Sequence, residues 1–252
     1  MAMRQNPREL DEGGSLAGEA VELAPPIGRR QQAKDERRAR IVAAAHNLMR
    51  HVGVEEMSMK QVALHAGVSL STVYNLFESK EDVLARVFNE AFDRYRVSVL
   101  ERASEDPLQR FFDAVDIAAE FYSADIPFYR SSVWLVEADS SYKLSLQKPR
   151  FGFFRDLVGR AIRAGLLRTD TDAYVLGLMV VPMFSAPYQA WAGGWISIDE
   201  FRARAKLGIA IVLEGYATSE HRARFDALLA ELEAQVKFHR GMGSARQGDG
   251  TR

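Results

Sequence analysis

The stretch from Ser58 to Lys80 constrains the fold of this chain more than any other. Ser58 and Gln61 have the spacing of a capping box, in which each side chain bonds the other residue's backbone N–H at a helix start. Gly67 can leave that helix with a positive φ, and Ser69 is placed to cap the next one. The sequence therefore predicts two short helices joined by a tight turn.

The second short helix has one apolar and one polar face. Val73, Leu76 and Phe77 recur at helical spacing and are expected to face inward. The outward side chains are mostly small hydrogen-bonding groups, namely Ser71, Thr72, Tyr74 and Asn75. This pattern is typical of a helix-turn-helix whose second helix enters the major groove of DNA, and an ordinary helical hairpin is the alternative interpretation.

The run from Arg40 to Phe92 resembles the DNA-binding domain of the TetR/AcrR family of bacterial transcription regulators. The matching segments are 41–45, the turn at Gly53, and 58–63, 66–69, 72–77 and 79–81. The resemblance implies an all-α fold, with an N-terminal three-helix helix-turn-helix domain followed by an α-helical ligand-binding and dimerisation domain. It also implies a homodimeric repressor that binds a palindromic operator and is released by a small apolar or aromatic effector.

The same resemblance assigns roles to individual side chains. Phosphate contacts are expected from Ser58, Lys60, Tyr74 and Lys80. Base contacts are expected from Ser69, Leu70, Ser71, Thr72 and Asn75. Three of these depart from the residues frequent in the family, which are a basic residue at 70, a glycine at 71 and a histidine at 75. With no Arg or Lys between Ser69 and Phe77, an arginine contact to guanine must come from elsewhere or be absent.

Composition and charge narrow the function further. The chain has no cysteine, which excludes disulfides and thiolate chemistry, and its net charge of -1 requires any DNA contact to come from a local basic patch. Such a patch lies between Arg29 and Arg40. It is either a solvated helix face or an arm that contacts DNA phosphates. We find no catalytic or metal-binding motif and expect no cofactor.

The chain divides into five predicted segments. They are a disordered extension (1–28), the helix-turn-helix domain (29–80), a connecting helix (81–103), the ligand-binding and dimerisation domain (104–240) and a loose glycine-rich tail (241–252). The first helix is predicted from about Asp35 to His51. Later helix starts are predicted at Pro107 and Pro127, after Pro149, and near Asp172, Ser197 and Ser219.

The uncharged stretch from Tyr174 to Ala192 approaches the length of a membrane span. Pro182 and Pro187 interrupt it and no positive cluster flanks it, so we expect no membrane partner. The absence of cysteine fits a reducing cytoplasm, and we expect a cytoplasmic protein. A helix buried on all sides, against its own domain and a second subunit, explains the same apolarity. The family resemblance implies that this helix and 198–216 form a four-helix bundle across a dimer.

Aromatic and methionine side chains are concentrated in the C-terminal half, where they suit a pocket for a small hydrophobic effector. The candidates are Phe111, Phe112, Tyr122, Phe128, Trp134, Phe154, Met179, Met183, Phe184 and Tyr188, with Ser131, Gln147, Arg150 and Gln189 as polar anchors. Two alternatives stay open. One is a constitutive DNA-binding protein whose C-terminal domain only dimerises, and the other is an enzyme that uses the C-terminal cavity.

Overall fold

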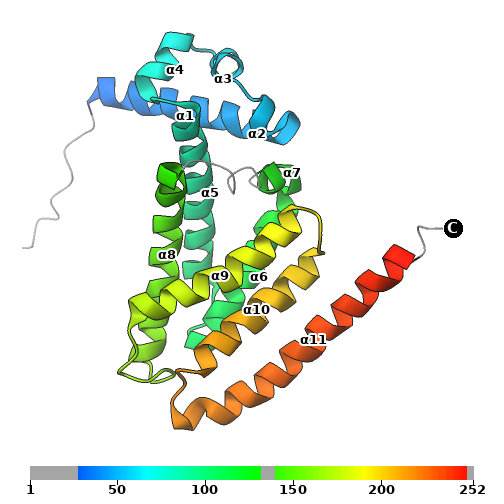
Figure 1. Cartoon of the computed structure of the whole chain (residues 1–252). Helices are drawn as coiled ribbons and strands as arrows, with labels where there is room; N and C mark the ends of the chain where they lie inside the picture. Colours follow the sequence, from blue (N-terminus) through cyan, green and yellow to red (C-terminus); the bar gives the residue numbers. More distant parts are fainter. Residues whose placement is uncertain (1–27, 132–139, 249–252) are drawn as a thin grey trace, which may run out of the picture.

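The computed structural model describes residues 28–131 and 140–248, with the backbone alone for 140–147 and 240–248. Within these ranges the chain is helical, and its only β pairing is an isolated bridge between Leu167 and Ala217 (Figure 1). The helices are α1 (Arg29–His51), α2 (Gly53–Glu56), α3 (Met59–Ala66), α4 (Leu70–Leu76), α5 (Lys80–Arg102), α6 (Pro107–Ala124), α7 (Ile126–Arg130), α8 (Ser140–Arg163), α9 (Ala173–Ala192), α10 (Ile198–Glu214), the 3-10 turn η2 (Ser219–His221) and α11 (Arg222–Gly248).

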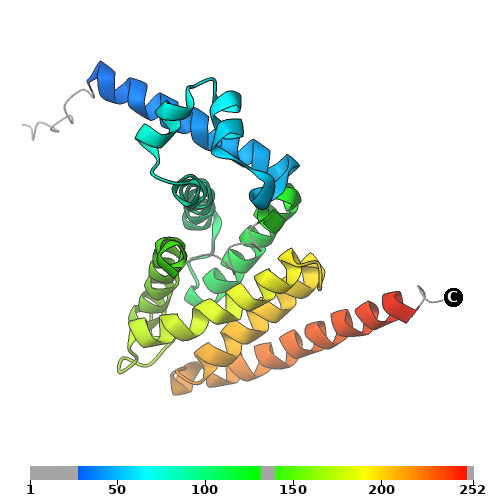
Figure 2. The same cartoon turned by 45° about the horizontal axis from the view of Figure 1, so that its top comes forward.

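Helices α1 to α4 form a unit at one end of the molecule, which we call the reader (Figure 2). Its core is closed by side chains from α1, α3 and α4. Ile41, Ala45 and Met49 of α1 are almost completely buried, as are Val62 of α3 and Val73 of α4. The apolar stripe of α1 thus packs against α3, and α4 packs against α3 in turn.

Helix α5 belongs to two hydrophobic cores along its length. Ser79 caps its start by accepting the backbone N–H of Asp82 at 3.1 Å, as the sequence predicts. The buried stripe of its first half, ending near Phe88, packs in the reader. From Phe92 and Tyr95 onward the stripe packs in the C-terminal bundle. A single rigid helix therefore joins the two cores.

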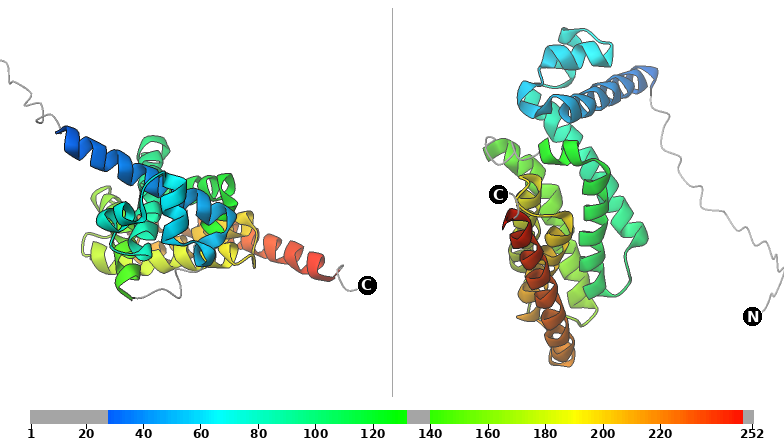
Figure 3. Two further views of the ribbon diagram at one scale, coloured as in Figure 1. Left: turned by 90° about the horizontal axis from the view of Figure 1, so that it is seen from above. Right: turned by 90° about the vertical axis from the view of Figure 1, so that its right-hand side faces the viewer.

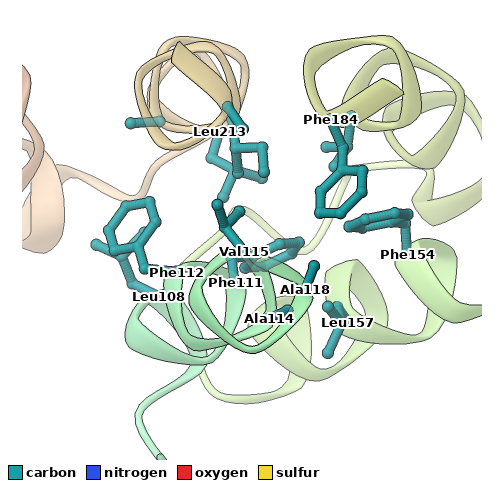
Figure 4. Packing of buried hydrophobic residues seen from close by; sticks show 14 of the residues in the cluster. Leu108, Phe111, Phe112, Ala114, Val115, Ala118, Phe154, Leu157, Phe184 and Leu213 are labelled. Atoms are coloured by element: carbon teal, nitrogen blue, oxygen red, sulfur yellow. The ribbon is translucent and has the colours of Figure 1, made fainter. Parts of the chain in front are cut away.

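The C-terminal core lies between α6, α8, α9 and α10. Figure 4 shows α6 beneath α9 and α10, with side chains from all four helices meeting between them. The labelled residues are Leu108, Phe111, Phe112, Ala114, Val115 and Ala118 of α6, Phe154 and Leu157 of α8, Phe184 of α9 and Leu213 of α10. Fully buried aromatic rings of this kind dominate the stability of a core.

Helix α9 is the one described helix long and apolar enough to cross a membrane, yet only 28% of its most apolar stretch is buried in the protomer. Pro182 and Pro187 lie inside it. Within one chain, α9 is therefore not buried on all sides, and an apolar stripe along it is exposed. The exposed members of that stripe are Tyr174, Val175, Leu178 and Met179.

Helix α11 runs beside α10 and then extends past the body of the molecule (Figures 1 and 3). Phe225 and Leu232 anchor it to the C-terminal core, whereas Phe238 is 63% exposed near its far end. Seen from above, the start of α1 and the end of α11 project on opposite sides (Figure 3).

Three predicted boundaries were wrong. Helix α1 begins at Arg29, not near Asp35, because the basic run continues the helix. Helix α8 passes through Pro149, where a helix start was expected, since the burial of Phe153, Leu157 and neighbouring side chains outweighs the lost backbone bond. Helix α11 continues to Gly248, through residues predicted to be loose. The predictions for residues 1–27 and Trp134 lie outside the described residues.

Candidate DNA-binding interface

The start of α3 is fixed by the predicted capping box. The backbone N–H of Ser58 donates to Gln61 Oε1 at 2.8 Å, and the backbone N–H of Gln61 donates to Ser58 Oγ at 3.3 Å. The Ser58 hydroxyl itself donates to Gln61 Oε1 at 2.8 Å. Since a hydroxyl has one donor, a bond from Ser58 to a DNA phosphate would have to replace its bond to Gln61.

The turn between α3 and α4 is made by Gly67, whose φ of 63° is left-handed and favours glycine. A Cβ built at this position would lie 3.9 Å from Nη1 of Arg40. The guanidinium of Arg40, which comes from α1, therefore reaches the turn that precedes α4. It makes no ion pair with any described residue, so its charge is available at this edge of the reader.

The start of α4 carries a cluster of three hydroxyl groups. Ser69 Oγ accepts the backbone N–H of Thr72 at 3.1 Å. The same oxygen lies 2.9 Å from Ser71 Oγ and 2.8 Å from Thr72 Oγ1. Ser69 is thus occupied as a helix cap, and the neighbouring hydroxyls are held in fixed positions with hydrogen-bonding capacity left over.

The remaining side chains of α4 divide into a buried face and an exposed face, as the sequence predicts. Val73 is completely buried, whereas Leu70 and Tyr74 are 41% and 52% exposed. Asn75 is exposed and makes no hydrogen bond to any described residue. Its amide therefore keeps the donor and acceptor that bidentate pairing with adenine requires. Leu76 is only half-buried, at the edge of the predicted inner face.

Two lysines flank the short helices. Lys60 is exposed on the first turn of α3. Lys80 begins α5, and its Nζ donates to the carbonyl oxygen of Glu55 at 3.2 Å, which holds the ammonium beside α2. Partial burial lowers the pKa of Lys80, while the charges of Glu81 and Glu55 act in the opposite direction. Lys80 is thus positioned by the fold and not freely solvated.

The basic run occupies the first turns of α1. Arg29, Arg30 and Arg40 are exposed, and Lys34 and Arg37 are half-buried. None of these five makes an ion pair with a described residue; Arg38, the sixth cation, lies 3.8 Å from Asp35. The net effect is a helical ridge of unneutralised positive charge that begins at Arg29 and ends beside the turn at Gly67.

The predicted ligand-binding residues do not share one site. The rings of Phe111, Phe112, Phe154 and Phe184 fill the C-terminal core, and Met179 lies on the exposed stripe of α9. The ring of Tyr122 stacks on Trp191 and is tilted against the ring of Tyr188, and Met183 lies against Gly208. Phe128 lies in the core of the reader, outside the domain to which the sequence assigned it. Ligand binding by these residues stays a prediction.

Sequence reasoning missed a cluster where α1 meets α7. Phe128 is 1% exposed, and its ring centroid lies 5.1 Å from that of Phe88 and 4.4 Å from that of His46. Beside it, Asp125 Oδ2 is 3.2 Å from His46 Nε2, and Asp125 Oδ1 is 2.9 Å from Arg50 Nε. Since α7 follows α6 directly, this cluster ties the C-terminal bundle to the reader at a second point beside α5. The sequence signals were weak, namely an aromatic residue after Pro127 and a histidine beside the apolar stripe of α1.

The charges in this cluster are partly compensated. Burial lowers the pKa of His46, Asp125 raises it, and Arg94 and Arg50 lower it further. His46 is therefore neutral near pH 7. The Arg50 N–H is not directed at Asp125 Oδ1, which is buried and has no hydrogen bond among the described residues despite the short distance. The positive charge of Arg50 nevertheless compensates the charge of Asp125 at this distance.

A reader with an exposed polar helix, joined by a long helix to a second helical domain, has the architecture of helix-turn-helix proteins. Residues 41–87 match the family model described as bacterial regulatory proteins, tetR family. The HTH-type transcriptional regulator HbdR of Aromatoleum sp. (strain CIB) is 24% identical over 81% of this chain and 90% of its own length. The predicted resemblance to the TetR family is confirmed over this helix-turn-helix segment.

Solved structures share the fold. A TetR transcriptional regulator from Rhodococcus sp. RHA1 superposes with a TM-score of 0.59 at 19% identity, over 72% of this chain and 97% of the other. The repressor FadR of Thermus thermophilus, solved in complex with lauroyl-CoA, gives a TM-score of 0.60 at 21% identity, over 72% of this chain and 95% of the other. The all-α fold with an N-terminal helix-turn-helix is thus as the sequence predicts.

Proposed function

We propose that this chain is a ligand-responsive repressor that binds a palindromic operator as a homodimer in the cytoplasm. The observation that carries the proposal is the outer face of α4. Its hydroxyls are fixed by the Ser69 cap, and the amide of Asn75 is unpaired and exposed. A helix of seven residues with such a face, packed on α3, suits direct reading of base edges.

The other proposed DNA contacts follow from where the side chains lie around α4. Tyr74, Lys60 and Lys80 are our candidates for phosphate contacts on either side of the reading helix, with Ser58 able to join them by giving up its bond to Gln61. Leu70, Ser71, Thr72 and Asn75 are our candidates for base edges. Because these side chains include no Arg or Lys, we expect the half-site to be read mainly through adenine and thymine.

Dimerisation is proposed from the exposed apolar face of α9. Tyr174, Val175, Leu178 and Met179 form a stripe, and Ile211 on the neighbouring α10 is 54% exposed. A contiguous apolar patch of this kind marks an interface in a soluble protein. A twofold axis through α9 and α10 would cover the patch with its own copy and would turn two readers toward one inverted repeat.

Release by a small apolar or aromatic effector is proposed for the C-terminal bundle. Its core is lined by aromatic rings, and the Thermus repressor of the same fold is solved with lauroyl-CoA, a ligand with a long apolar chain. The main rival is a constitutive DNA-binding protein. It differs in one measurable property, since no ligand would change its affinity for DNA.

The test is selection of DNA from a random pool by the purified full-length protein. We expect an inverted repeat with half-sites about one helical turn, or a multiple of it, apart. Asn75→Ala should relax the choice at one position, whereas Asn47→Ala, which alters an exposed asparagine on α1, should leave the selected site unchanged. A selected site without twofold symmetry would refute the homodimer, and failure to enrich any sequence would refute specific binding.

A further inference from the structure

A cavity of about 370 Å³ lies between the reader and the C-terminal bundle, at the cluster where α1 meets α7. Its walls come from four helices and the junction between two of them. They are formed by His46 of α1, Arg94 of α5, Glu120, Phe121 and Ala124 of α6, Asp125 at the junction, and Phe128 and Tyr129 of α7. We propose that this interdomain cavity binds a small organic carboxylate, anchored by Arg94, and that its occupancy alters DNA binding.

The charges around the cavity favour an anion. Glu120 is paired with Arg102 at 2.7 Å, and Asp125 is within 2.9 Å of Arg50. Both acids in the wall are thus neutralised by arginines. Arg94 makes no ion pair or hydrogen bond with any described residue, and His46 is neutral near pH 7. One unpaired positive charge remains, and a carboxylate is its natural bidentate partner.

The shape and lining favour a compact molecule with an apolar body. The rings of Phe121, Phe128 and Tyr129 and the methyl group of Ala124 make most of the wall apolar. The volume is at the low end of the range for ligand sites, about 300–1,000 Å³, so the cavity suits a one-ring or short-chain acid and not a nucleotide-sized molecule. It is also separate from the core rings of Phe111, Phe154 and Phe184.

The position of the cavity gives the ligand a means of regulation. Its wall includes a side chain of the reader, His46, and side chains of the bundle, so its dimensions depend on how the two pack. A ligand that fits one packing better than another shifts the balance between them and, through it, the spacing of the readers. This regulatory part rests on the proposed function, whereas the binding site does not.

The binding test uses para-fluorobenzoate as the probe, followed by fluorine NMR with the full-length protein. We expect saturable binding of the acid and none of the neutral para-fluorobenzyl alcohol. Arg94→Gln should weaken binding about tenfold or more, because a charge-assisted pair is lost. The matched control is Arg96→Gln, which alters an exposed arginine on the same helix that lies 3.5 Å from Asp93 and outside the cavity wall. Ala124→Phe should fill the cavity and abolish binding.

The results separate the two parts of the proposal. No binding of the acid to the wild type, equal affinities for Arg94→Gln and Arg96→Gln, or unimpaired binding by Ala124→Phe would overturn the site. If the acid binds through Arg94 but leaves the affinity for the selected DNA unchanged, the regulatory role is refuted and the site stands. If the protein selects no DNA, the proposed function fails while the binding result is unaffected.

Discussion

Replacing Phe128 by alanine is the sharpest test of how the two parts of this molecule are joined. The ring belongs to α7 but is buried in the reader, against Phe88 and His46. Removing a ring buried to this degree costs about 3–5 kcal/mol, because both the transfer free energy and the cavity left behind count against the folded state. That is a large fraction of the roughly 5–15 kcal/mol that keeps a domain folded.

The measurement is urea unfolding followed by far-ultraviolet circular dichroism. With a slope of about 2 kcal/mol per molar urea, the midpoint for Phe128→Ala should fall by roughly 2 M. Phe238→Ala is the matched control, since its ring is 63% exposed and its loss should change stability by no more than about 0.5 kcal/mol. Hydrogen exchange should accelerate in α1 and in the first half of α5. If the two variants lose equal stability, or if exchange accelerates only in the C-terminal bundle, α7 does not anchor the reader.

Four further predictions concern DNA binding, its coupling to the effector, and pH. Asn75→Ala should reduce the free energy of DNA binding by about 1–3 kcal/mol per half-site. Lys80→Ala should weaken binding to all sequences alike and reduce the slope of log affinity against log salt concentration by roughly one unit per subunit. Fluorescence anisotropy measures both. Phe92→Ala, which removes a ring packed on Phe153 of α8, should reduce the coupling between effector and DNA by about 0.5–2 kcal/mol; unchanged coupling in a thermodynamic cycle would exclude this contact from the signal. The pKa of His46 is lowered in the folded chain, so below about pH 6.5 the unfolded chain binds more protons than the folded chain. The free energy of unfolding therefore falls on acidification, and this fall should be smaller in His46→Gln than in the wild type.

The reader could be predicted because its signals are local. The capping box of Ser58 and Gln61, the left-handed Gly67 and the cap at Ser69 each depend on residues within four positions of one another. The inner face of α4 follows from helical periodicity alone, and Val73 is buried as that periodicity requires. Local chemistry and the final fold agree in this part of the chain.

The interdomain cluster could not be predicted because its partners are far apart in the sequence. Nothing near His46 indicates that it meets Asp125, and the apolar Phe128 has the same local pattern whether it lines a pocket or enters the reader. Pro149 shows the opposite error. A proline is a strong local signal for a helix boundary, yet α8 continues through it, and the buried face of the helix begins four residues later at Phe153.

The length of α5 sets the mechanical sensitivity of the molecule. At 1.5 Å per residue, its 23 residues make a rod of about 34 Å, whose first half packs in the reader and whose second half packs in the C-terminal bundle. A tilt of about 5° at the bundle end would swing the reader end through about 3 Å, close to the 3.4 Å step between neighbouring base pairs. The C-terminal bundle thus needs to rotate this helix by only a few degrees to move α4 out of register with its half-site.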